Sequence, residues 1–191
     1  MATKAGERKL QILQVIAEML ETPQGEKVTT AALAARLDVS EAALYRHYAS
    51  KAQMYEGLIE FIENSVFSVI NQIEQDEESG LKQAELIVAS LLRFAQKNRG
   101  LTRVLIGDAL VHENPRLQVR INQLLERIEA SLKQSLRISS TQGALPAEHD
   151  FGAHANTLVA YVLGRWHLFV KSGFKTEPLA QLPVQWSILK A

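Results

Sequence analysis

The sequence has no cysteine among its 191 residues, so disulfide bonds and thiolate metal sites are excluded. No apolar run approaches the roughly 18 residues that a membrane-spanning helix needs. The N-terminus also lacks the apolar core of a secretory signal peptide. These absences favour a soluble cytoplasmic protein without membrane contact.

An excess of charge of one sign is also lacking, because 21 Lys and Arg residues balance 21 Asp and Glu residues. Residues 1–51 hold seven Lys or Arg and six Asp or Glu, and this near balance of charge does not indicate a nucleic-acid partner. No nucleophile elbow, phosphate-binding loop or HExxH motif is present either. We therefore expect neither an enzyme nor a bound cofactor, and any case for nucleic-acid binding must come from geometry.

Apolar residues recur at helical spacing through most of the chain, and no segment alternates as a strand does, so the spacing predicts an all-α fold. Thr29 or Thr30, Ser40 and Ser50 are the expected N-caps of the second, third and fourth helices. Pro23-Gln24-Gly25 is expected to close the first helix, and Asn98-Arg99-Gly100 to form a left-handed stop. The longer helices are predicted over about 7–22, 51–76, 81–97, 101–112, 115–138 and 147–172, with a short one from Pro183. The expected buried stripes include Leu10, Leu13, Ile16, Ala17 and Leu20 on the first helix, and Val66, Val69 and Ile70 on the fourth.

Residues 29–51 have the layout of a helix-turn-helix followed at once by the cap of another helix. With Leu44 directed inward and 100° per residue, Tyr48 and His47 fall about 40° and 60° from Leu44, on or beside the core face. The opposite half suits a DNA groove, because small side chains allow close approach while arginine and tyrosine reach bases and phosphates. Its members are Ala42, Ala43, Tyr45 and Arg46. Thr30 and Lys51 offer a hydroxyl and an ammonium group to phosphates. The alternative to a DNA-binding helix-turn-helix is an ordinary helical hairpin with a polar face.

The segment Val39–Tyr48, with Ser50-Lys51 after it, resembles the signature of the TetR family of bacterial regulators. The resemblance implies a homodimer with an N-terminal three-helix head, here 1–51, and a helical dimerisation and partner-binding body, here 52–191. It implies phosphate contacts from Thr30, Tyr45, His47 and Lys51, and base contacts from Ala42, Ala43 and Arg46. Asp38 replaces the usual turn glycine, and aspartate can adopt the left-handed conformation at modest cost.

The body carries a second resemblance, to the nucleoid occlusion factors within this family. Its carriers are Leu58–Glu63, Gly100–Arg103 and Arg120–Ala130. It implies that a DNA-bound dimer captures the division protein FtsZ over the nucleoid, through a surface that includes Phe61, Lys97 and Asn98. A ligand-responsive transcriptional repressor is the alternative function, with the same head and a pocket in the body.

Other groups of residues have simpler interpretations. Asp108 and His112 lie four residues apart, and without a third ligand they favour a surface ion pair over a metal site. The three histidines from residue 149 to residue 167 look structural. Phe67 lies outside the stripe of its helix, so it is expected to pack under a neighbour or to face a partner. A dimer seam or a ligand cavity is expected from Tyr161, Trp166, Phe169 and Phe174.

Overall fold

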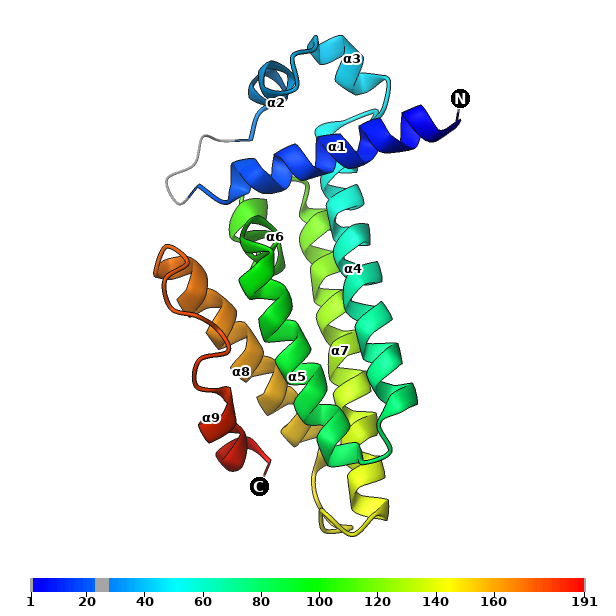
Figure 1. The fold of residues 1–191 in the computed structure, drawn as a ribbon, viewed down its shortest axis with the longest axis vertical. Coiled ribbons are helices and arrows are strands. Elements are labelled where there is room, and N and C mark those ends of the chain that lie inside the picture. The colour runs from blue at the N-terminus through cyan, green and yellow to red at the C-terminus, as the bar shows by residue number, and fades with distance from the viewer. Residues whose placement is uncertain (1, 23–27, 191) are drawn as a thin grey trace. The chain divides into compact units, whose positions relative to one another are not determined.

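A computed structural model describes residues 2–22 and 28–190, and within these residues the protein contains nine α-helices, one 3₁₀ turn and no strand. The all-α prediction is therefore confirmed (Figure 1). In the same residues, no helix combines the length and the apolar character needed to cross a bilayer. The predicted closing turn Pro23-Gln24-Gly25 lies outside the described residues. The elements are α1 (Ala2–Leu20), α2 (Thr30–Arg36), α3 (Glu41–Tyr45), α4 (Lys51–Asp76), α5 (Gly80–Lys97), α6 (Arg99–Leu105), η1 (Asp108–Leu110), α7 (Pro115–Thr141), α8 (Phe151–Lys171) and α9 (Leu182–Leu189).

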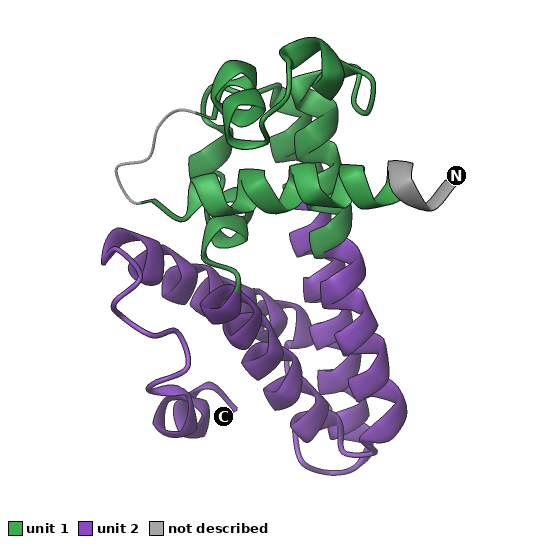
Figure 2. Cartoon of the chain, turned by 45° about the horizontal axis from the view of Figure 1, so that its top comes forward, with its two compact units in different colours: residues 1–62, 98–121 green, residues 63–97, 122–191 purple. Residues whose placement is uncertain are grey.

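Packing divides the chain into two compact units (Figure 2). Unit 1 comprises residues 1–62 and 98–121, and unit 2 comprises residues 63–97 and 122–191. The long helices α4 and α7 each pass from one unit into the other. The predicted boundary between a DNA-binding domain, 1–51, and a dimerisation and partner-binding domain, 52–191, stays a prediction.

In unit 1, α1 buries Ile12, Ile16 and Met19, which are spaced four and three residues apart. The expected stripe on this helix was partly wrong, because Leu10 is 47% exposed. The buried face of α1 is the one that packs against α6. A Cβ on Gly100 would stand 2.0 Å from the carbonyl oxygen of Ala17, so only glycine allows this approach.

The expected left-handed stop at residues 98–100 was wrong. Asn98 has φ −126° and is the N-cap of α6, which begins at Arg99. The expected helix over 101–112 is instead α6, a left-handed Gly107 with φ 79°, and the 3₁₀ turn η1. The Nη1 group of Arg103 donates to the Leu20 carbonyl at the end of α1 (3.2 Å), and its Nε donates to Asp108 (2.5 Å). Asp108 therefore pairs with arginine, and the pair expected with His112 was wrong.

The centre of unit 2 is formed by α5 and α8, which run side by side (Figure 1). Trp166 is fully buried, and its Nε1–H donates to the Leu91 carbonyl at 3.2 Å. Phe169 is also buried and meets Phe174 edge to face at 5.1 Å. The hydroxyl of the half-buried Tyr161 donates to Gln185. Trp166, Phe169 and Phe174 are buried within one chain, so a dimer seam made from these three residues was wrong. The ligand cavity stays a prediction.

Two residues on the distal half of α4 separate from its buried stripe. Val66 and Ile70 are buried, whereas Val69 is 46% exposed, which contradicts its expected place in the stripe. Phe67 is half-buried because the guanidinium of Arg127 on α7 lies 3.9 Å from its ring centroid. The ring contacts α7 through this arginine, and the expectation that Phe67 packs under a neighbour or faces a partner stays a prediction.

The histidines at the start of α8 link that helix to α9. Nε2 of His149 lies 2.8 Å from Nδ1 of His154, and Nε2 of His154 lies 2.6 Å from the Leu189 carbonyl oxygen. Burial is the main cause that lowers the pKa of His154. Within the described residues, no group of three or more His, Cys, Asp or Glu side chains is placed to hold a metal ion.

Candidate nucleic-acid interface

The helices α2 and α3 form the predicted helix-turn-helix in unit 1. The side chain of Thr29 caps α2 by accepting a hydrogen bond from the Ala32 N–H (3.1 Å). Ser40 caps α3 in the same way, through the Ala43 N–H (3.2 Å). Asp38 has φ 52°, so it adopts the left-handed conformation expected for the turn. Local capping and turn chemistry therefore fix the relation between the two helices.

The outward face of α3 has the exposure that its helical angles predict. Ala42, Tyr45 and Arg46 are exposed and Ala43 is half-buried, whereas Leu44 is only 1% exposed. The small core beneath them includes Leu33 and Ala34 of α2. An exposed alanine beside an exposed arginine and tyrosine suits a groove, because the backbone can approach bases while the longer side chains reach outward.

His47 and Tyr48 follow α3 and are both half-buried, as their angles predict. The Nζ of Lys9 lies 5.4 Å from the centroid of the Tyr48 ring. The pKa of Tyr48 is raised, mainly by burial and then by the nearby Glu60. Tyr48 therefore anchors the segment after α3 against its own unit, and His47 beside it faces α1.

Thr30 connects the start of α2 with the start of α3. Its Oγ1–H donates to Oε2 of Glu41 at 2.6 Å. The hydroxyl proton is therefore engaged by a carboxylate in the absence of DNA. Phosphate oxygens only accept hydrogen bonds, so Thr30 can contact a phosphate through this hydroxyl only by donating its proton. That contact requires the hydroxyl to break its hydrogen bond to Glu41.

Lys51 opens α4 and is held by a carboxylate from a distant part of the chain. Its Nζ lies 2.5 Å from Oε1 of Glu113, and the two side chains are 24% and 13% exposed. The same Nζ lies 5.6 Å from the ring centroid of Tyr55. The pKa of Tyr55 is raised, mainly by burial and then by the Glu113 charge. Sequence reasoning missed Glu113, because it is 62 residues from its partner and has no spacing signal.

The start of α4 is fixed by a reciprocal cap. The Gln53 N–H donates to the Ser50 hydroxyl (3.2 Å), and the Ala49 N–H donates to the Gln53 side chain (2.9 Å). This resembles a capping box, in which the side chain of the N-cap accepts from the backbone N–H three residues on. The side chain of that later residue in turn accepts from a backbone N–H at the cap. The expected N-cap at Ser50 is confirmed, and it sets the position of the neighbouring Lys51.

The residues expected to bind a protein partner lie on three elements. Phe61 on α4 is 43% exposed, which is a large exposure for a phenylalanine. Lys97 is exposed at the end of α5, and Asn98 is the N-cap of α6. Phe61 and Asn98 belong to unit 1, and Lys97 belongs to unit 2.

Comparison with known families divides the chain into two matched parts. Residues 12–58 match the family of bacterial regulatory proteins called the tetR family. Residues 59–191 match a tetracyclin repressor-like C-terminal domain of the SlmA-like type. The first match covers the helix-turn-helix, and the second covers most of the chain.

Individual relatives match over nearly the whole length. The chain is 47% identical over 189 residues to the nucleoid occlusion factor SlmA of Marinomonas sp., covering 99% of this chain and 96% of that protein. It is 49% identical over 185 residues to the nucleoid occlusion factor SlmA of Aliivibrio fischeri, covering 96% and 94%. Among solved structures, a TetR transcription regulator from Haloarcula marismortui aligns with a TM-score of 0.80 at 17% identity, covering 97% of each chain. At that identity the structural likeness indicates a common fold only.

Proposed function

Because the chain belongs to the TetR family of bacterial regulators, and to the part of it with an SlmA-like C-terminal domain, we propose that it is a nucleoid occlusion factor. In this proposal a homodimer binds palindromic chromosomal DNA in the cytoplasm and inhibits FtsZ assembly over the nucleoid. Family membership makes the chain a DNA-binding regulator and not an enzyme.

The observation that carries the proposal is identity through the body. A helix-turn-helix head is common to regulators with many functions, so the head alone says little about what the protein does on DNA. The 47–49% identity to nucleoid occlusion factors extends over 96–99% of this chain, so it includes most of the C-terminal match. Sharing of the body as well as the head supports a shared function.

The DNA contacts are proposed for α3 and its flanks. Arg46 and the two alanines of α3 face the bases, and four side chains hold phosphates on either side of them. The exposure of Ala42, Tyr45 and Arg46 supports this assignment. The proposed phosphate contacts are Thr30, Tyr45, His47 and Lys51, and the proposed base contacts are Ala42, Ala43 and Arg46.

A dimer surface is proposed on the exposed faces of α8 and α9. Ala160, Gly164 and Leu168 are exposed at intervals of four residues on α8, and Leu168 is 51% exposed. On α9, Val184 and Ile188 are 67% and 73% exposed. An apolar surface of this kind favours burial against a second copy, and a twofold dimer places two recognition helices on a palindromic site.

FtsZ is the proposed protein partner, and Phe61, Lys97 and Asn98 are the proposed contact residues. An exposed aromatic ring is a typical anchor of a protein interface, and a lysine and an asparagine suit its polar rim. The exposure of Phe61 and Lys97 supports their accessibility to a partner.

The test is capture of purified FtsZ by the full chain bound to an immobilised DNA duplex that it recognises. We expect capture that requires the duplex, that is lost in Phe61→Ala, and that is retained at equal DNA occupancy in Val119→Ala, which alters a 54% exposed residue of α7. Absence of capture at every salt and DNA concentration would overturn the FtsZ proposal. Release of the duplex by a small molecule, without FtsZ capture, would instead identify a ligand-responsive repressor.

The DNA-binding head has a separate test. Replacement of both Tyr45 and Lys51 by alanine is expected to weaken DNA binding and to reduce the dependence of log Kd on log salt. If neither the affinity nor the salt slope changes, then α2 and α3 are not the DNA-binding head.

A further inference from the structure

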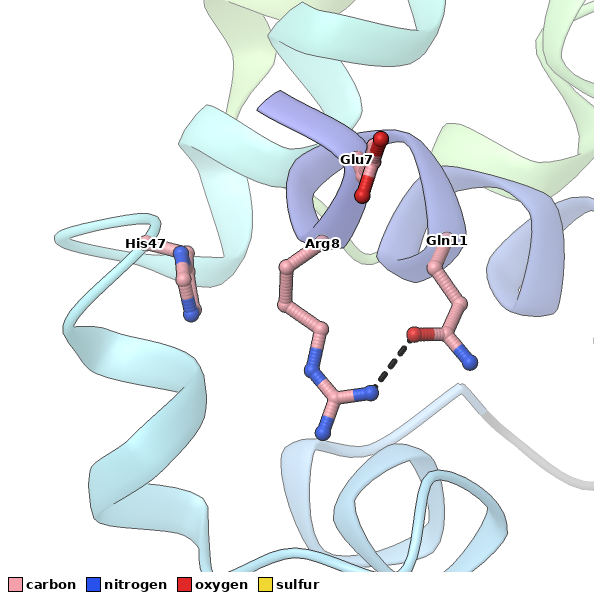
Figure 3. A pocket seen from close by; sticks show the side chains of 4 residues that line it. All are labelled: Glu7, Arg8, Gln11 and His47. Carbon is pink, nitrogen blue, oxygen red and sulfur yellow. Dashed lines mark hydrogen bonds between the residues drawn. The ribbon is translucent and has the colours of Figure 1, made fainter. Parts of the chain in front are cut away.

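A hollow of about 580 Å³ opens on unit 1 between the N-terminal half of α1 and the segment after α3. Its lining residues are Glu7, Arg8, Gln11 and His47 (Figure 3). Arg8 and Gln11 extend from α1 toward the same side, and His47 lies across from them. The Nη1–H of Arg8 donates to Oε1 of Gln11 at 2.6 Å, so the guanidinium is held in place before any ligand arrives.

The donors in this hollow suit a phosphate. A guanidinium is planar, is always charged and presents five N–H donors in a fork that matches phosphate oxygens. Gln11 occupies one donor of Arg8 through its carbonyl oxygen, and the remaining guanidinium N–H groups of Arg8 are the donors proposed for a ligand. Glu7 also lines the hollow, and its carboxylate opposes an anion. The hollow therefore offers the permanent positive charge of Arg8, the opposing charge of Glu7 and two further polar side chains.

The position of the hollow identifies the ligand class. His47 follows Arg46 directly, so one wall of the hollow continues the surface proposed to meet DNA. Lys9, the neighbour of Arg8, lies over the Tyr48 ring at 5.4 Å. The first half of α1 thus places two successive cations beside the segment that follows the recognition helix.

The charge balance of the head makes an additional arginine at this position important for DNA binding. Among the proposed phosphate contacts only Lys51 carries a permanent charge, and Glu113 holds that ammonium at 2.5 Å. Non-specific affinity for DNA comes mainly from neutralising phosphates with lysine and arginine. Positions 1–51 hold seven basic and six acidic residues, so few basic side chains are left to neutralise phosphates. A preorganised arginine beside the recognition helix is therefore expected to have a large effect on the affinity for DNA.

From these observations we infer that Arg8, held by Gln11 and facing His47, binds a backbone phosphate of the DNA. The inference rests on the proposed DNA-binding function and extends its footprint from α3 to α1. Arg8 supplies charge without sequence information, and Gln11 is a positioning residue for its guanidinium. Binding through Arg8 is therefore expected to contribute equally to specific and non-specific duplexes.

The test measures Kd against salt for the full-length dimer on a specific and a non-specific duplex. Arg8→Gln is expected to weaken binding five- to tenfold near 0.1 M salt on both duplexes, and to reduce the slope of log K against log salt by about 1.8, because the dimer loses two phosphate contacts. Gln11→Ala is expected to weaken binding two- to threefold while the slope stays the same, because the charge remains. Arg36→Gln is the matched control, since it removes the same charge from an exposed position at the end of α2.

The outcomes separate this inference from the proposed function. If the wild type binds DNA and Arg8→Gln behaves as Arg36→Gln does, the phosphate site on α1 is wrong and the DNA-binding function stands. If the wild type binds no duplex, the proposed function itself is wrong. If Arg8→Gln abolishes binding of inorganic phosphate but leaves DNA binding unchanged, the hollow is a small-anion site and the inference is overturned.

Discussion

Neutralisation of Glu113 is expected to tighten DNA binding. In the absence of DNA, the ammonium of Lys51 lies 2.5 Å from a Glu113 carboxylate that is only 13% exposed. A phosphate that recruits Lys51 must compete with this carboxylate, and removing the ammonium leaves a largely buried negative charge without its partner. In Glu113→Gln that competition is gone, and Lys51 is free to turn to the DNA.

The size of the effect follows from the geometry of the pair. A charge-assisted hydrogen bond contributes about 1.5–3 kcal/mol net, and DNA recovers part of that when the phosphate replaces the carboxylate. A remaining cost of about 1–1.4 kcal/mol corresponds to a five- to tenfold gain in affinity for Glu113→Gln. Fluorescence anisotropy with a labelled duplex, at several salt concentrations, measures this gain directly.

Two further variants make the experiment decisive. Glu18→Gln removes the same charge from an exposed position of α1 and is expected to change Kd less than twofold, because no cation is released. In a Lys51→Ala background, Glu113→Gln is expected to have no more effect than Glu18→Gln. If Glu113→Gln binds as the wild type does, or more weakly, Lys51 does not exchange its carboxylate for a phosphate and the reasoning is refuted.

Three other perturbations test the packing of the two units and the dimer. Gly100→Ala places a Cβ 2.0 Å from the Ala17 carbonyl and is expected to destabilise the protein by about 2 kcal/mol or more in urea unfolding, whereas Gly6→Ala, which meets open space, does not. Burial lowers the pKa of His154 below 6.5, and His149 adds to the shift, so the unfolded chain binds more protons than the folded protein. The free energy of unfolding should therefore fall as the pH drops from 7.5 to 5.5, and it should fall less steeply in His154→Gln. Ile188→Arg on α9 is expected to give monomers in sedimentation and to weaken binding to a palindromic duplex while leaving secondary structure unchanged; a stable dimer would exclude this surface.

Local signals in the sequence predicted most of the helix-turn-helix. Thr29, Ser40 and Ser50 act as the expected caps because capping depends on residues within three positions. Asp38 adopts the expected left-handed turn, and the exposure around Leu44 follows from the helical angle alone. These features are set by neighbours in the chain, so a single sequence contains them.

Features set by distant residues were not predictable in the same way. The sequence around Gly100 is typical of a helix stop, yet that glycine is required by its contact with Ala17, more than 80 positions away in the chain. Trp166 and Phe169 of α8 are equally suited to a dimer seam and to a core, and their burial within one chain places them in the core. Carboxylates hold Thr30 and Lys51 through contacts that carry no spacing signal.

The central claim is that the DNA-bound protein acts on FtsZ. Its most direct test is sedimentation of GTP-assembled FtsZ with the full chain, with and without a specific duplex, for the wild type and for Phe61→Ala at equal DNA occupancy. We expect the wild type with duplex to lower the pelleted FtsZ strongly, and the duplex-free protein and Phe61→Ala to have little effect. Equal amounts of pelleted FtsZ in all samples would contradict the claim.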